Sequence, residues 1–197
     1  DQTAPQLTCP ANTTVSCLTQ VPAVDTDAVG TSDNCGGAVT VTHIGDAPSG
    51  TCPTIITRTY EGEDACGNTA QCAQTITVDD QTAPQLTCPA NTTVSCLTQV
   101  PAVDTDAVGT SDNCGGAVTV THIGDAPSGT CPAIITRTYE GEDACGNTAQ
   151  CAQTITVDDK TAPELTCPAN TTVSCMNQIP AGEINAVGAS DNCGSGV

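Results

Sequence analysis

The chain has 197 residues, with 22 acidic and three basic side chains and a formal net charge of −19. Nucleic-acid-binding proteins neutralise phosphates with a basic face, and Arg58, Arg137 and Lys160 alone do not supply one. The same acidity opposes binding to an anionic membrane, and no apolar run reaches the length of a membrane span. No signal peptide is recognisable, so we expect any export signal to lie outside this sequence.

The sequence repeats itself with a period of 79 residues: nearly the same stretch of sequence starts at Asp1, at Asp80 and at Asp159. The first two copies differ at one position, Thr54 against Ala133. Solenoid repeats are about 20–50 residues long and need their neighbours to form a core, whereas a unit of this length suffices for a small domain. We therefore predict a string of domains: a first repeat at 1–79, a second at 80–158 and the front half of a third at 159–197.

Each full repeat carries six cysteines, and the whole chain has no Trp, no Phe and two Tyr. A domain this small buries little apolar surface and usually needs covalent staples. An even number of cysteines in a loop-rich unit indicates disulfides and an oxidising compartment. Zinc is the rival explanation, but the closest pair, Cys66 and Cys72, lies too far apart for the usual ligand spacing. The cysteines therefore predict disulfides.

The strand signals of one repeat are short and separated by turn residues. In the first repeat we expect strands at 6–9, 13–17, about 23–30, 38–44, 54–63 and 70–78. The loop TSDNCGG follows the third, the turn-rich GDAPSGTCP follows the fourth, and DACGN connects the last two. Helix signals are missing. The pattern predicts an all-β fold of tandem β-sandwich domains, stapled by disulfides.

Two residue types on these strands are expected in the interior. Tyr60 and Tyr139 are the only aromatic side chains of their repeats and alternate with other inward positions, so we predict core residues. His43 follows Val39 and Val41 on one strand face, which indicates a packed or strand-end side chain rather than a ligand.

Four segments carry a family resemblance: DQTAPQLTCPANTTV, SDNC, DACGN and CAQTITVDD, in this order. They resemble the hyalin-repeat (HYR) family of immunoglobulin-like modules, in particular the cysteine-rich variants strung along large bacterial surface proteins. The resemblance covers both full repeats and the front half of the third. It implies an extracellular β-sandwich used in adhesion or as a stalk, without catalysis. Arg58 departs from the pattern, because such modules usually carry an apolar residue on that strand face.

Acidic residues gather on both sides of each joint, which is our term for the boundary between consecutive repeats. The strand order of such a sandwich brings the SDNC and DACGN loops to the end where the domain begins. Calcium takes six to eight oxygen ligands, and clustered carboxylates supply them. We predict calcium sites formed by Asp79, Asp80, Asp112, Asn113, Glu142 and Asp143; by Asp158, Asp159 and Asp191; and by Asp1, Asp33, Glu63 and Asp64. The alternative is that Asp and Asn only serve the turns of solvated loops, as Asp46 is expected to do.

The same topology predicts disulfides within each repeat. Cys35 and Cys66 belong to the two loops at one end, and Cys17 and Cys52 to the opposite end, which leaves the remaining two cysteines on neighbouring strands. The expected pairs are Cys9–Cys72, Cys17–Cys52 and Cys35–Cys66, repeated as Cys88–Cys151, Cys96–Cys131 and Cys114–Cys145.

These features predict an extracellular or cell-surface structural module: a stalk, filament or adhesin shaft rigidified by calcium. Its partners would be further copies of the repeat, in the same chain or through lateral or end-to-end self-association. The alternative is a ligand-binding module that recognises a receptor or glycan, although two nearly identical copies favour a shaft. No nucleophile and base stand in a catalytic pattern, so we expect no enzyme. Asn12, Asn91 and Asn170 fit the N-glycosylation sequon.

Overall fold

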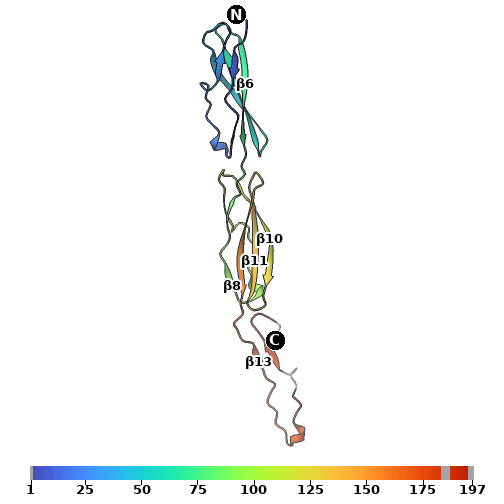
Figure 1. Ribbon diagram of the computed structural model, residues 1–197. Helices are drawn as coiled ribbons and strands as arrows, with labels where there is room; N and C mark the ends of the chain where they lie inside the picture. Colours follow the sequence, from blue (N-terminus) through green and yellow to red (C-terminus); the bar gives the residue numbers. More distant parts are fainter. Residues whose placement is uncertain (1, 183–186, 195–197) are drawn as a thin grey trace. The chain divides into compact units, whose positions relative to one another are not determined.

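The computed structural model describes residues 2–182 and 187–194 (Figure 1). It contains two compact units, one formed by Asp1–Thr87, Gly109–Thr121 and Glu140–Gln150, the other by Cys88–Val108, His122–Tyr139 and Cys151–Val197. Strands and three short 3-10 helices are the regular elements of the described residues, so the predicted all-β fold is confirmed. Among these residues no helix is both long and apolar enough to cross a membrane.

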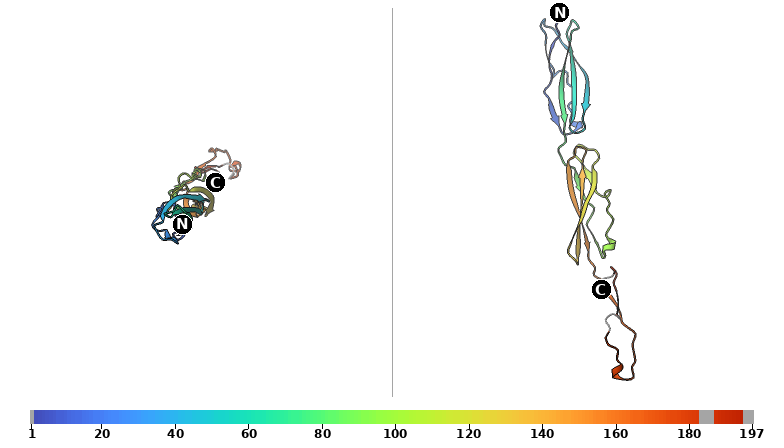
Figure 2. Two further views of the ribbon diagram at one scale, coloured as in Figure 1. Left: turned by 90° about the horizontal axis from the view of Figure 1, so that it is seen from above. Right: turned by 90° about the vertical axis from the view of Figure 1, so that its right-hand side faces the viewer.

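The first repeat builds a four-stranded and a two-stranded sheet. The larger has the order β2 (Thr13–Val15), β6 (Thr69–Val78), β5 (Thr54–Glu63) and β4 (Thr40–Ser49). Strand β2 runs parallel to β6, and the other pairs are antiparallel. The smaller sheet pairs β1 (Gln6–Thr8) with β3 (Gly30–Ser32), and the 3-10 helix η1 spans Leu18–Gln20. The long strands lie side by side in Figure 1 and in the right-hand view of Figure 2.

The second repeat has the same elements. Its sheets join β10 (Thr119–Ser128), β11 (Ala133–Glu142), β12 (Thr148–Val157) and β8 (Thr92–Val94), and separately β7 (Gln85–Thr87) and β9 (Gly109–Ser111), with η2 at Leu97–Gln99. In the third copy the described elements are β13 (Glu164–Thr166), η3 (Met176–Gln178) and β14 (Gly188–Ser190). Strand β13 pairs with β14 as β1 pairs with β3.

The core of the first repeat is a small cluster on one face of the larger sheet. Ile56, Ile76 and Val78 are buried together, because alternate residues of a strand point to the same face. Tyr60 is 1% exposed, and Tyr139 in the second repeat equally so, which confirms both as core residues. The ring of His43 lies 6.0 Å from that of Tyr60, so this histidine is packed as expected.

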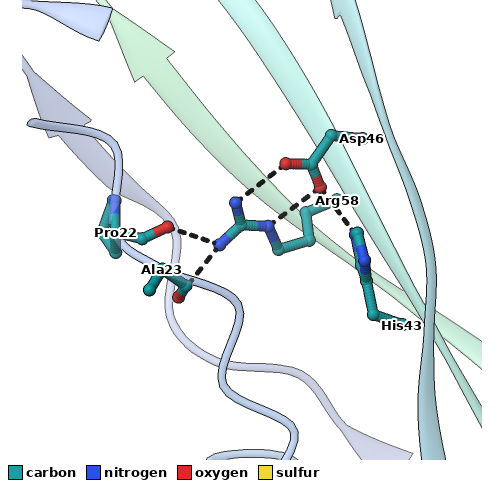
Figure 3. Close-up of polar contacts among 5 residues, drawn as sticks. All are labelled: Pro22, Ala23, His43, Asp46 and Arg58. Carbon is teal, nitrogen blue, oxygen red and sulfur yellow. Dashed lines mark hydrogen bonds and ion pairs between the residues drawn. The ribbon is translucent and has the colours of Figure 1, made fainter. Parts of the chain in front are cut away.

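Arg58 lies on the inward face of β5 and is 4% exposed. Its Nε and Nη2 donate to the two carboxylate oxygens of Asp46 at 2.9 and 2.8 Å. Its Nη1 donates to the carbonyls of Pro22 and Ala23 at 2.9 and 3.3 Å (Figure 3). A buried cation is tolerated only when it is paired and hydrogen-bonded. Arg58 therefore fastens the segment before β3 to the sheet, in place of the usual apolar contact.

Two expectations about local structure were wrong. The segment 23–30 is not a strand, because Asp25 Oδ1 accepts the backbone N–H groups of Asp27 and Ala28 and closes a turn. Asp46 does not serve a turn either. Strand β4 continues to Ser49, where it pairs residue by residue with β5 and places Asp46 opposite Arg58. The sheet pairing outweighs the turn propensity of GDAPS.

Candidate functional site

One predicted disulfide is present in each full repeat. Cys9 is bonded to Cys72, with Cα atoms 5.7 Å apart, and Cys88 is bonded to Cys151 with the same spacing. Each bond fastens the segment after β1 or β7 to the last long strand of its own repeat. These two bonds confirm the predicted pairing of the first and last cysteines.

Three further disulfides cross a joint. Cys17 is bonded to Cys114, and Cys52 to Cys145, so two bonds connect the first and second repeats. At the next joint Cys96 is bonded to Cys193, which repeats the first of these bonds. These bonds replace three predicted pairs, which were wrong: Cys17–Cys52, Cys96–Cys131 and Cys114–Cys145. The predicted pair Cys35–Cys66 was also wrong, because both cysteines are free.

The physical reason is the closeness of consecutive repeats. Strand β6 ends at Val78 and β7 begins at Gln85, so the connection is short. The end of the first repeat then touches the loops of the second: Cys114 Sγ lies 3.3 Å from the carbonyl oxygen of Ser16. The prediction grouped the cysteines correctly by end but considered pairs within one repeat only. The short linker, read together with the period, is the signal that could have found the crossing.

Five described cysteines are free and exposed. Four stand at positions whose counterparts in another repeat cross a joint: Cys35 corresponds to Cys114, Cys66 to Cys145, Cys131 to Cys52, and Cys175 to Cys17 and Cys96. The fifth, Cys167, corresponds to Cys9 and Cys88, which are bonded within their own repeats.

Three of the residues predicted for calcium meet at the first joint. Asp80, although charged, is only 7% exposed. Ligand atoms of Asp80, Asp112 and Cys114 lie within 4.8 Å of one another, but Cys114 Sγ is bonded to Cys17 and leaves the two carboxylates. Asn113 Nδ2 donates to Asp80 Oδ1 at 3.2 Å. The arrangement places two acids close together, with the Asn113 side chain and the Thr82 N–H both donating to Asp80 Oδ1.

One oxygen of this pair lacks a protein partner. Asp112 Oδ1 accepts the N–H of Cys114 at 3.0 Å, whereas its Oδ2 is buried without a hydrogen bond. Asp33 in the first repeat has an equivalent orphaned oxygen. An unpartnered buried carboxylate oxygen is costly, and a hard divalent cation accepts such ligands. The donor set fits calcium in kind, with the further oxygens that calcium requires left to water and backbone.

Asp143 lies near this pair but has another task. Asp143 Oδ1 accepts the N–H groups of Cys145 and Asn147 at 2.8 and 2.9 Å, and its Oδ2 accepts Asn147 Nδ2 at 2.9 Å. Asn147 Nδ2 also donates to the carbonyl of Asp80. Hydrogen bonds of the same kind lower the pKa of Asp64 in the first repeat, with its Asn68 contact as the largest cause. Both carboxylates therefore hold the DACGN turn, as the alternative interpretation expected.

The remaining predicted ligands are distributed as follows. Asp79 Oδ2 accepts Gln81 Nε2 at 2.9 Å, and Glu142 is exposed beside the DACGN turn. At the next joint Asp159 and Asp191 come together as Asp80 and Asp112 do. Asp158 instead pairs with Lys160 at 3.1 Å, Glu63 is exposed at the end of β5, and Asp1 lies outside the described residues.

A cavity of about 160 Å³ lies between the two disulfides of the first joint. Its lining includes both bonds, Leu18, Val78, Asp80 and Asp112. The acid pair therefore borders the same space as the covalent connections.

The sequons stay a prediction, although the structure assigns their asparagines a role in the fold. Asn12 Oδ1 accepts the backbone N–H of Thr75 at 2.8 Å, and Asn91 accepts that of Thr154 at the same distance. Both asparagines are exposed.

Comparison with protein families gives one result. The sequence profile described as "HYR-like domain with 4 cysteines" matches residues 5–78 and 84–157, which is most of the chain. A comparison with curated proteins gives no match. Domains of this kind are extracellular adhesion-type modules, typically structural rather than catalytic, and the five disulfides fit an oxidising compartment. The chain belongs to the family of HYR-like domains with four cysteines.

Proposed function

We propose that the chain is part of an extracellular shaft in which consecutive repeats are fixed to one another covalently. The observation that carries the proposal is the pair of disulfides from the first to the second repeat, Cys17–Cys114 and Cys52–Cys145. A module that binds a ligand by itself needs no covalent bond to its neighbour. Two bonds at one joint restrict both rotation and bending, which is useful when a string of domains must keep its direction.

We further propose that calcium binds at the joint between Asp80 and Asp112. Support comes from the burial of Asp80 and from the orphaned Oδ2 of Asp112. Calcium would neutralise two carboxylates that repel one another, and it would supply a partner for the orphaned oxygen. Magnesium is the weaker candidate, because it demands tight octahedral geometry and keeps its waters.

The covalent joint is tested by solution scattering on the oxidised chain and on a Cys52→Ser/Cys145→Ser variant. We expect the variant, which retains Cys17–Cys114, to sample a broader range of angles, with a lower mean end-to-end distance. Reduction of the parent chain should broaden the distribution further. Identical curves for the parent, the variant and the reduced chain would overturn the shaft proposal. They would favour independent domains and thus a ligand-binding module.

The calcium site is tested by titration calorimetry with CaCl₂. We expect Asp112→Asn to remove one binding event, because the substitution removes the orphaned carboxylate oxygen. Asp106→Asn is the matched control: it makes the same change of charge at an exposed aspartate of the same repeat and should leave the titration unchanged. An identical titration for the parent and the Asp112→Asn chain would mean that the acids at the joint only serve their loops.

A further inference from the structure

The disulfide between Cys17 and Cys114 lies beside the acid pair of the first joint. Asn113 Nδ2 is 3.7 Å from Cys17 Sγ and 3.1 Å from Cys114 Sγ. The same nitrogen is 3.2 Å from Asp80 Oδ1. Cys114 Sγ and carboxylate oxygens of Asp80 and Asp112 lie within 4.8 Å of one another. Two sulfurs and two carboxylates from two repeats therefore come together, and all four belong to one compact unit.

The second joint repeats this arrangement. Cys193 Sγ lies within 4.8 Å of carboxylate oxygens of Asp159 and Asp191, and this sulfur is bonded to Cys96. Asn192 Nδ2 is 3.6 Å from Cys96 Sγ and 3.2 Å from Cys193 Sγ. The combination of two sulfurs with two carboxylates thus recurs with the period of the sequence.

The state of the two sulfurs decides which metal this donor set fits. In the disulfide neither sulfur is a thiolate, so oxygen ligands remain, and these suit calcium. Reduction of Cys17–Cys114 adds two thiolates, which select zinc over hard cations. A tetrahedral zinc ion binds sulfur at about 2.3 Å, which places its two sulfur ligands about 3.8 Å apart. Two cysteine side chains whose Cα atoms are 5.0 Å apart can span that separation.

The surroundings of these groups favour a bound cation. Asp80 is only 7% exposed, and Asp112 Oδ2 is buried without a hydrogen bond. The three basic side chains of the chain form their ion pairs elsewhere, with Asp46, Asp125 and Asp158. The cavity of about 160 Å³ is bordered by both cysteines and both acids, so it gives an ion access to all four. Zinc would replace the thiol protons and neutralise the added charge.

We propose that the first joint is a zinc site while its crossing bond is reduced, with the ligands Cys17, Cys114, Asp80 and Asp112. The equivalent ligands at the second joint are Cys96, Cys193, Asp159 and Asp191. In this state zinc holds the two cysteines of a crossing bond side by side before the bond forms. The inference goes beyond the proposed calcium site, because it shares the carboxylates of that site but requires the opposite state of the sulfurs.

A small disulfide such as oxidised glutathione converts the zinc site into the crossing bond. The Cys114 thiolate attacks one glutathione sulfur and releases the first glutathione thiolate. The Cys17 thiolate then attacks the Cys114 sulfur of the mixed disulfide and releases the second. Two protein thiolates are oxidised to one disulfide, and one glutathione disulfide is reduced to two thiolates. Zinc has then lost both sulfur ligands and leaves the site.

The test measures the reactivity of each cysteine in the full chain. The chain is reduced with a water-soluble phosphine and alkylated with iodoacetamide, with and without zinc sulfate. Trypsin then cuts after Arg58, Arg137 and Lys160, so the nearly identical repeats give different peptides, in which fragment-ion spectra locate the label. We expect zinc to protect Cys17 and Cys114 from alkylation, because the metal occupies the nucleophilic thiolates.

The Asp80→Asn/Asp112→Asn chain separates this site from adventitious zinc binding by thiols. Asparagine can still accept the hydrogen bonds that Asp80 Oδ1 and Asp112 Oδ1 accept, but it is a poor zinc ligand. Protection should be lost at the cysteines of the first joint. It should persist at Cys96 and Cys193, whose carboxylates are unchanged and which serve as the control within the same molecule.

Two further controls make the comparison specific. Cys167, which is free and exposed, should react equally with and without zinc. The Asp27→Asn/Asp106→Asn chain loses two exposed charges and should keep the protection at both joints.

Equal alkylation of Cys17 and Cys114 with and without zinc would overturn the inference. Protection of these cysteines that survives Asp80→Asn/Asp112→Asn would also overturn it, because the carboxylates would then not be ligands. Calcium titration of the oxidised chain is a separate measurement. If Asp112→Asn removes a calcium-binding event there while zinc protects no cysteine, only the zinc site is wrong. If zinc protects the cysteines while the calcium titration is unchanged, only the calcium site fails.

Discussion

At the scale of single residues, Arg58 compensates for a core that contains few apolar side chains. Its burial removes a cation from water, and bonds to one carboxylate and two carbonyls offset that cost. Arg137 makes the same contacts with Asp125 in the second repeat. The sequence marked Arg58 as a departure from its family. It did not identify the partner, because Asp46 lies within a run of turn residues.

This ion pair makes the stability of the fold depend on pH. The hydrogen bond from Arg58 lowers the pKa of Asp46 to about 2, and Arg137 does the same for Asp125. An ordinary aspartate titrates near about 3.9, so the pair stabilises the fold fully above about pH 4 and loses this contribution as the pH falls towards about 2. Because Asp46 is 33% exposed, we expect a loss on the order of only 1–2 kcal/mol per repeat.

Urea unfolding between pH 5 and pH 2 measures this dependence. In the Asp46→Asn/Asp125→Asn chain the free energy of unfolding should be lower at pH 5 and should change less on acidification. The exposed pair Asp27→Asn/Asp106→Asn is the control for the loss of two charges. If the two variants have the same acid profile, the ion pairs do not contribute the expected dependence.

At the scale of elements, the long strands are the part of the fold that the sequence predicts best. The segments 54–63 and 70–78 alternate buried residues such as Ile56, Ile76 and Val78 with less buried neighbours, and they form β5 and β6 almost at the expected bounds. Short β3 was misplaced, because a run of Val, Asp and Ala can form either a strand or a turn. The Asp25 side chain accepts a hydrogen bond from the backbone N–H of Asp27 and thereby stabilises the turn. Local propensities do not reveal such a contact.

Strand β5 approaches β1 closely at a glycine. A Cβ atom on Gly62 would lie 2.6 Å from Leu7 Cδ2 and 3.1 Å from Val39 Cγ1. We expect Gly62→Ala to destabilise the first repeat by about 1–3 kcal/mol, because the two side chains must move in a packed interior. Chemical denaturation measures the change.

The matched control is Gly45→Ala on β4, where an added Cβ would meet no heavy atom within 4 Å. Combining Gly62→Ala with Leu7→Ala should cost less than the sum of the two single changes, because the clash is removed. Additive costs would show that Leu7 is not the obstacle.

At the scale of the whole molecule, the connections between repeats were the part that the sequence did not predict. Period, charge and family resemblance indicated tandem disulfide-stapled sandwiches. Whether a cysteine at the end of one repeat bonds within it or to the next depends on how closely the ends approach. Secondary-structure propensity carries no information about that distance. The short segment between Val78 and Gln85 does, because it keeps the ends of the two repeats close together.

Trypsin offers a test of the bond across the second joint. Lys160 is 82% exposed, whereas Arg58 and Arg137 are each 4% exposed, so the folded chain should be cut after Lys160 first. We expect the two fragments to stay together on a non-reducing gel through Cys96–Cys193 and to separate after reduction. A Cys96→Ser chain should separate without reductant. Separation of the parent fragments without reductant would contradict the crossing.

The series of bonds across joints also changes how the chain answers a pulling force. A covalent path enters at Cys17, crosses to Cys114, returns along the backbone to Cys96 and crosses again to Cys193. Most of the polypeptide lies outside this path and carries no tension even when every strand has melted. When a single oxidised molecule is stretched, its contour length should therefore increase little. Its force–extension curve should lack the sawtooth pattern that successive unfolding of ordinary tandem domains gives. Reductant in the buffer would restore the sawtooth, so the redox state of the medium sets the extensibility of the chain.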